Sequence, residues 1–145
     1  MTDIKEQSMG RFSVEVELTN FGDLVRVKDG TIQPGQIRRT LARGVVDSGA
    51  MRLVIPELMV EQLGLDVSGM AKVRYADGHT AERGIARNIH LSYGGREGVF
   101  SAIVEPARES ILIGAIVLED LDLLVDCSKQ RLVPRDPKQI VSEIE

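Results

Sequence analysis

Polar and apolar residues alternate along much of the chain, and this alternation predicts β-strands. In the segment 11–20, apolar side chains stand at every second position: Phe12, Val14, Val16 and Leu18. A repeat of two residues is typical of a strand with one buried face and one face in water. By the same criterion, DLVRVKDG (23–30) predicts a second short strand after a turn at NFG, and a third strand is expected from about Ile37 to Val46.

The repeat lengthens after Ile55, where residues 55–65 predict a short helix. Proline is favoured in the first turn of a helix and glycine just past the last turn, and Pro56 and Gly64 occupy such places. A single helical turn is expected near the other end of the chain, at 116–121. The apolar residues of the longer segment fall on one side of the predicted helix: Leu58, Met59 and Leu63.

Two glycine-containing turns predict two successive hairpins. Asp77-Gly78 and Gly94-Gly95 each lie between alternating segments. Further along, LLVD (123–126) and RLVP (131–134) predict two more strands joined by the turn CSKQ. Because strands outnumber helices so strongly, we expect an all-β fold, a small closed barrel or a sandwich with one or two short helices.

Length, composition and charge narrow the class of protein. A chain of 145 residues with 43% hydrophobic residues is expected to form one folded domain. A net charge of -4 and an aromatic content of 3% argue against nucleic-acid binding, which needs clustered cations and stacking side chains. No apolar stretch approaches the roughly 20 residues that span a bilayer, and residues 1–10 do not read as a signal peptide. We therefore expect a cytoplasmic protein without a membrane partner.

The segment GVVDSGAMRLVIP (44–56) places one ionisable group at the end of an apolar run. Val45 and Val46 favour burial, so Asp47 would be carried to the interior end of a strand. A buried carboxylate without partners costs several kcal/mol of desolvation. Gly49 allows a turn whose backbone N–H groups approach the carboxylate, and Ser48 offers a hydroxyl donor nearby.

These residues resemble a known motif. VVDSGA resembles the active-site sequence of aspartic proteases, in which two apolar residues precede Asp, then Thr or Ser, then Gly. ILIG (111–114) resembles the second signature of that family, two apolar residues followed by Gly. The order of motif, short helix, two hairpins and second signature is similar to that of single-lobe, retropepsin-like members, over Phe12 to Pro134. The resemblance implies a small closed barrel of the retropepsin type at 11–136, between a flexible N-terminus (1–10) and a C-terminal tail (137–145).

The resemblance also implies an activity and a partner. Family members with one Asp motif per chain form homodimers in which the two Asp residues meet at the twofold axis. A second copy is not found in this chain, because Asp29-Gly30 and Asp77-Gly78 lack the hydroxyl residue and the apolar residues before it. The implied function is an aspartic endopeptidase acting on peptides or proteins with neither metal nor cofactor. Its catalytic residues would be Asp47, Ser48 and Gly49, with the Ser48 hydroxyl bonded to the opposite chain.

The expected substrate-covering hairpin departs from the family pattern. By position, its tip would be formed by Ala76, Asp77, Gly78 and His79, with one glycine and charged neighbours where retropepsin tips are glycine-rich. Tyr75 would either face the site or pack. Ala115 stands where viral members commonly have Arg, so their interface salt bridges do not transfer. These departures leave open an alternative function, an inactive retropepsin-like module that binds peptides or dimerises.

Other candidate sites are weaker. His79 and His90 have no neighbouring ligand set, and Cys127 has no adjacent base. A solvated turn explains the acidic run between Glu119 and Asp126 better than a calcium loop does. The tail has three apolar residues that would belong either to a frayed end or to a dimer contact: Ile140, Val141 and Ile144.

Overall fold

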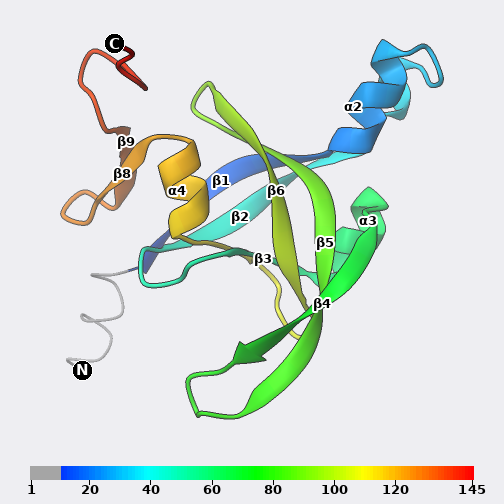
Figure 1. Cartoon of the computed structure of the whole chain (residues 1–145), viewed down its shortest axis with the longest axis horizontal. Helices are drawn as coiled ribbons and strands as arrows, with labels where there is room; N and C mark the ends of the chain where they lie inside the picture. Colours follow the sequence, from blue (N-terminus) through cyan, green and yellow to red (C-terminus); the bar gives the residue numbers. More distant parts are fainter. Residues whose placement is uncertain (1–10) are drawn as a thin grey trace.

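A computed structural model describes residues 11–145, so the prediction of a flexible segment at 1–10 lies outside the described residues. Figure 1 shows strands curving around a central core, with short helices at the periphery. The elements in chain order are β1 (Arg11–Asn20), α2 (Phe21–Lys28), a 3-10 turn (Pro34–Gln36), β2 (Arg39–Asp47), β3 (Leu53–Pro56), α3 (Glu57–Leu63), β4 (Val67–Arg74), β5 (Thr80–Tyr93), β6 (Arg96–Glu105), β7 (Ile111–Ile113), α4 (Ala115–Asp120), β8 (Leu123–Asp126) and β9 (Arg131–Pro134).

The main sheet closes into a barrel. Its strands lie in the order β1-β2-β7-β3-β6-β5-β4, and a further pairing of β1 with β5 joins the two sides. Six strands therefore form a closed ring, and β4 continues beyond it as the outer strand of a hairpin with β5. Strands β8 and β9 form a separate two-stranded sheet. The predicted all-β closed barrel is confirmed.

The barrel interior is aliphatic, as expected for a chain without tryptophan. The alternation in β1 places Phe12, Val16 and Leu18 in the core, and β2 contributes Val46 with no exposed surface. Burying such side chains supplies the main driving force for folding. The largest fully buried hydrophobic side chains come from all sides of the barrel and from α3 and α4: Leu18, Val46, Leu53, Ile55, Leu63, Ile89, Leu91, Ile111, Ile113 and Val117.

The strand predicted at 23–30 is wrong, because this segment belongs to helix α2. Asn20 caps the helix by accepting a hydrogen bond from the backbone N–H of Asp23 at 3.0 Å, so NFG begins a helix instead of forming a turn. The apolar residues of DLVRVK alternate in sequence, but the helix leaves Val25 47% exposed. The Asn20 cap and the buried Asp23 therefore favour a helix here, although the apolar residues alternate as in a strand. The described residues thus have three α-helices, not one or two.

The remaining element predictions are close to the structure. Helix α3 ends at Leu63 and is followed by Gly64, whose φ of 61° is the left-handed conformation that glycine tolerates best. Pro56 is the residue before the helix instead of its first residue. Both hairpins form, with Gly78 (φ 91°) in the turn between β4 and β5. The strand expected from Ile37 begins two residues later, at Arg39, and the last two predicted strands are β8 and β9.

Candidate active site

Asp47 is the last residue of β2, and its side chain is mostly buried, with 17% exposed. Its Oδ1 accepts a hydrogen bond from the backbone N–H of Gly49 at 3.0 Å. Its carbonyl oxygen accepts one from the N–H of Ala50 at 3.1 Å, which closes a tight turn. A Cβ atom at position 49 would lie 3.3 Å from the Asp47 Oδ1. A glycine therefore lets the backbone approach the carboxylate, as the sequence indicated.

The second carboxylate oxygen is held by a residue that the sequence did not single out. Arg11 is paired with Asp47 in the register of β1 and β2, and its Nη2 lies 3.1 Å from the Asp47 Oδ2. The Arg11 side chain is 60% exposed. These two residues are far apart in the sequence and meet only because β1 pairs with β2 in this register. Predicting the contact would have required knowing that pairing.

The segment ILIG lies directly beside the Asp47 turn. Strand β7 runs parallel to β2, with Val46 opposite Ile113, and also pairs with β3 through Leu112 and Val54. The N–H of Ala115 donates to the carbonyl of Ala50 at 2.8 Å. A Cβ atom on Gly114 would lie only 2.6 Å from the carbonyl oxygen of Arg52, so this contact requires glycine. Strand pairing and a backbone hydrogen bond thus join two segments that are more than 60 residues apart in the sequence.

Ser48 is exposed, and its hydroxyl makes no hydrogen bond with any of the residues that the structure describes. Met51, in the same loop, is 65% exposed. The N–H of Ile116, at the start of α4, donates to the Met51 carbonyl at 2.9 Å. The backbone around Asp47 is therefore fixed, while the side chains beside it face outward.

The predicted tip residues form the turn between β4 and β5, which projects from the barrel in Figure 1. The N–H of His79 donates to the Asp77 Oδ1 at 3.0 Å, and this bond and the one from the His79 ring hold the pKa of Asp77 below its ordinary value. Between this tip and the Asp47 turn, the described residues share neither a hydrogen bond nor an ion pair. The structure brings Asp47, Ser48 and Gly49 together and places Ala76 to His79 on a separate hairpin.

Tyr75 packs at the base of this tip, which answers the question that the sequence left open. Its hydroxyl donates to the Glu105 Oε2 at 2.6 Å and accepts from the Arg83 Nε at 2.8 Å. The nearby Glu105 carboxylate raises the pKa of the Tyr75 hydroxyl, which stays a donor at neutral pH. The Tyr75 ring stacks on His79, with ring centroids 4.5 Å apart. These contacts tie the hairpin to strand β6.

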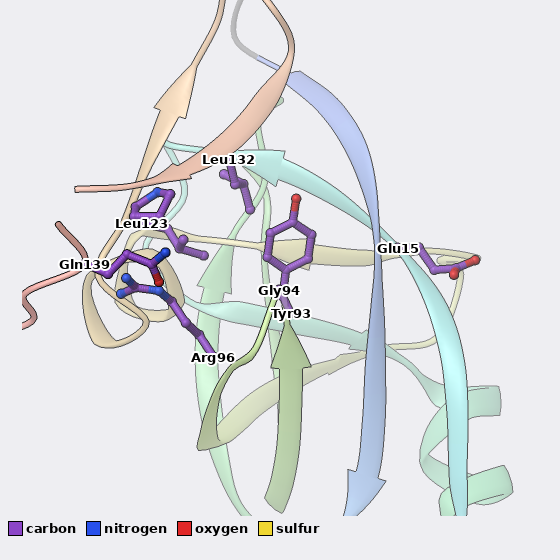
Figure 2. A pocket seen from close by; sticks show the side chains of 8 residues that line it. Glu15, Tyr93, Gly94, Arg96, Leu123, Leu132 and Gln139 are labelled. Atoms are coloured by element: carbon purple, nitrogen blue, oxygen red, sulfur yellow. The ribbon is translucent and has the colours of Figure 1, made fainter. Parts of the chain in front are cut away.

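A cavity of about 430 Å³ lies away from the Asp47 turn. In Figure 2 the Tyr93 ring extends from the end of β5 toward Leu132 of β9. Arg96 in the same wall donates to the carbonyl of Leu121 at 2.8 Å. The sequence did not single out this cavity, whose lining comes from three regions of the chain: Glu15, Tyr93, Gly94, Arg96, Leu123, Leu132, Pro134 and Gln139.

The described part of the chain offers neither a cluster of metal ligands nor a helix that could span a membrane. Within 11–145, there is no group of three or more His, Cys, Asp or Glu side chains placed to hold a metal ion. The two histidines contact one carboxylate each, His79 with Asp77 and His90 with Glu97. No helix in this part of the chain is long and apolar enough to cross a membrane.

Comparison with known proteins supports the fold. No family model matches the sequence, and no curated protein matches it. Among solved structures, the EIAV protease complexed with the inhibitor HBY-793 is similar, with a TM-score of 0.53 and 15% sequence identity. The match covers 77% of this chain and 88% of the EIAV protease chain. At this identity the likeness concerns the fold alone. The chain therefore has a closed barrel of the retropepsin type, the fold of a retroviral protease.

Proposed function

We propose that the protein is an aspartic endopeptidase that acts as a homodimer. The observation that carries the proposal is the Asp47 turn: a largely buried carboxylate, fixed by the Gly49 N–H and braced by Gly114, in a barrel similar to that of a retroviral protease. Such bracing keeps a reactive group in one geometry, which catalysis by positioning requires. The proposed substrate is an extended peptide or an unfolded protein.

A second copy would supply the second carboxylate. A twofold axis brings the same surface of both copies together, so one Asp47 per chain gives a pair. The outward-facing groups around the turn suit such a contact, because the Ser48 hydroxyl has no partner among residues 11–145 and Met51 is 65% exposed. We assign to Ser48 a hydrogen bond to the opposite chain and to Met51 part of the buried contact.

The proposed chemistry follows from the electrostatics of two adjacent acids. Carboxylates about 3 Å apart cannot both ionise, which is the established behaviour of aspartic protease pairs. The ionised Asp47 accepts a proton from a bound water as the water oxygen attacks the peptide carbonyl carbon. The protonated Asp47 donates to the carbonyl oxygen, forming a tetrahedral diol. The Asp47 that took the water proton then donates it to the amide nitrogen, a diol hydroxyl returns a proton to the other Asp47, and the C–N bond breaks without a covalent enzyme intermediate.

The hairpin from Ala76 to His79 would cover the bound peptide. Covering a site excludes water and strengthens the electrostatic interactions inside it. The bonds from Tyr75 to Glu105 and Arg83 would act as the fixed base of this cover. Its exposed tip carries the polar side chains of Asp77 and His79. The tips of retropepsins are glycine-rich instead.

The alternative is an inactive module of the same fold. It is favoured by the contact of Arg11 with the Asp47 Oδ2, because an acid engaged by a cation in its own chain is less free to share a proton with a twin. In that case the protein would bind peptides or dimerise without cutting them.

The test compares the wild type with Asp47→Asn. The purified wild type is expected to cleave an unfolded protein at mildly acidic pH and to be blocked by a statine-type transition-state mimic. Asp47→Asn should lose cleavage and still sediment as a dimer in the analytical ultracentrifuge. Peptide retention without cleavage by either protein would support the inactive module. Cleavage that persists in Asp47→Asn, or a wild type that is monomeric at high concentration, would remove the proposed mechanism.

A further inference from the structure

The segment that connects β6 to β7 carries a second arginine near Asp47. Arg108 lies three residues before Ile111, the first residue of β7, which pairs with Gly44 in the strand that ends at Asp47. Its Nε donates to the carbonyl oxygen of Ser110 at 2.8 Å. This bond fixes the direction of the guanidinium and leaves its two terminal nitrogens as donors.

The connection that contains Arg108 runs from Glu105, at the end of β6, to β7, which lies beside the strand that ends at Asp47. Its guanidinium interacts electrostatically with Asp47, Arg11 and Glu105. Glu105 belongs to the base of the hairpin, where it binds the Tyr75 hydroxyl. Because this connection joins the base of the hairpin to the strand beside Asp47, we infer that an extended peptide lying between the Asp47 turn and the hairpin would pass near Arg108.

The charge of Arg108 is not neutralised within the chain. The two carboxylates in its neighbourhood already have arginine partners, Asp47 with Arg11 at 3.1 Å and Glu105 with Arg83 at 3.6 Å. Among residues 11–145, Arg108 forms no ion pair. It is also half-buried, and this burial lowers its pKa more than any other influence does. A partly desolvated cation without a counterion is costly, whereas an exposed arginine such as Arg52 is solvated.

We propose that Arg108 binds an acidic side chain of the substrate, so that the peptidase prefers Asp or Glu close to the scissile bond. A guanidinium offers paired N–H donors that match a carboxylate, which makes it the side chain best suited to this recognition. The inference rests on the proposed function and names its substrate class. Because the twofold axis repeats every residue, the two copies of Arg108 lie on opposite sides of the scissile bond. The acidic preference therefore occurs at two symmetry-related substrate positions.

The experiment measures kcat/KM for matched peptides that carry either Glu or Gln at each position around the cleaved bond. The peptides are acetylated and amidated, so that only side-chain carboxylates are present, and a free-acid series tests the terminal carboxylate separately. Assays run above about pH 5, where glutamate is ionised. For the wild type we expect kcat/KM for Glu to exceed that for Gln by about tenfold at two positions, as for a hydrogen bond to a charged group.

Variants of Arg108 separate recognition from folding. Arg108→Gln should bring the Glu-to-Gln ratio close to one, Arg108→Lys should retain part of it, and Arg108→Glu should favour Lys peptides. Arg39→Gln is the matched control, because Arg39 is an exposed arginine at the opposite end of β2 from Asp47, and it should keep the wild-type ratio. A fall of the wild-type ratio with added salt supports the inference without any variant.

The possible failures are distinguishable. Asp47-dependent cleavage without an acidic preference, or a preference that persists unchanged in Arg108→Gln, overturns the role of Arg108 and leaves the proposed function intact. A preference restricted to the free-acid series overturns the side-chain assignment in favour of a terminal carboxylate. The absence of Asp47-dependent cleavage in every peptide overturns the proposed function, and the inference falls with it.

Discussion

Arg11 and Asp47 occupy directly opposite positions in β1 and β2, and a 3.1 Å salt bridge joins the Arg11 Nη2 to the Asp47 Oδ2. With the Gly49 N–H on Oδ1, both oxygens of the candidate catalytic acid are engaged within one chain. In the proposed homodimer, the second Asp47 carboxylate would approach an acid that already has two partners.

The Arg11 contact should add little to the stability of the fold. Because the Arg11 side chain is 60% exposed, water screens the pair, and such pairs contribute less than about 1 kcal/mol. We expect urea unfolding of Arg11→Gln to give a free energy within about 1 kcal/mol of the wild type. Arg39→Gln, which removes a similarly exposed pair with Glu17, is the control. A much larger loss of unfolding free energy in Arg11→Gln alone would mean that the Arg11–Asp47 pair stabilises the barrel.

Gly114 should be essential to the shape of the Asp47 turn. Its φ of -96° is accessible to alanine, so a substitution is opposed by contact and not by backbone strain. The new Cβ would meet backbone atoms of Met51 and Arg52 at 2.6 to 2.8 Å, and these cannot move without shifting the loop. We expect Gly114→Ala to lower the free energy of unfolding by about 2 to 3 kcal/mol and to reduce any peptidase activity more than stability alone explains.

Gly35→Ala is the control for this prediction. A Cβ at Gly35 would meet no atom within 4 Å. The change should leave thermal and urea unfolding nearly unaltered. If the two substitutions changed the free energy of unfolding equally, the backbone of Met51 and Arg52 would not be what excludes a side chain at position 114.

The sequence predicted best what depends on local periodicity. Alternation placed Phe12 and Leu18 in the core, and the glycine turns at Gly78 and Gly94 marked both hairpins. The same criterion failed at α2, since the helix there depends on the Asn20 cap and on the ion pair between Asp23 and Arg38, which are 15 residues apart. Periodicity contains no information about such pairs.

The candidate site was predictable in part. Asp47 could be singled out because a carboxylate after two valines and before Ser-Gly is chemically unusual. Arg11 could not, because its relation to Asp47 follows from strand register across more than 30 residues. Arg108 was missed for a similar reason: it lies in an irregular connection, and its electrostatic interaction with Asp47 depends on the folded chain and not on local periodicity.

Stability should fall in acid because of Asp23. This buried carboxylate accepts two hydrogen bonds from the Arg38 guanidinium, at 2.9 and 3.0 Å, and one from Arg26 at 2.8 Å. The bond from the Arg38 side chain is the main reason that its pKa lies well below the ordinary 3.8. A group with a depressed folded-state pKa stabilises the protein above its unfolded pKa and loses that contribution as the pH falls toward the folded value.

Asp23→Asn tests this directly. At pH 7 it should cost about 3 kcal/mol, because it leaves arginines without their buried partner. The difference from the wild type should shrink as the pH falls below about 4, where the Asp23 carboxyl of the unfolded wild type takes up its proton while the folded state still holds it ionised. Asp66→Asn is the control, since the exposed Asp66 interacts with Arg38 without a hydrogen bond. A pH-independent difference for Asp23→Asn would contradict the assignment.

The hydroxyl of Tyr75 should control the opening of the β4–β5 hairpin. It joins the base of the tip to Glu105 at 2.6 Å and to Arg83 at 2.8 Å, and its raised pKa keeps the proton in place through neutral and mildly alkaline pH. Tyr75→Phe removes both hydrogen bonds while leaving the ring to stack on His79. Hydrogen exchange of the amides in β4 and the adjoining half of β5 should then become several-fold faster, and the KM for peptides should rise. Tyr93→Phe is a fitting control, because the Tyr93 hydroxyl has no hydrogen bond among residues 11–145. If exchange in the hairpin were equally fast in both variants, the Tyr75 contacts would not be what holds the tip in place.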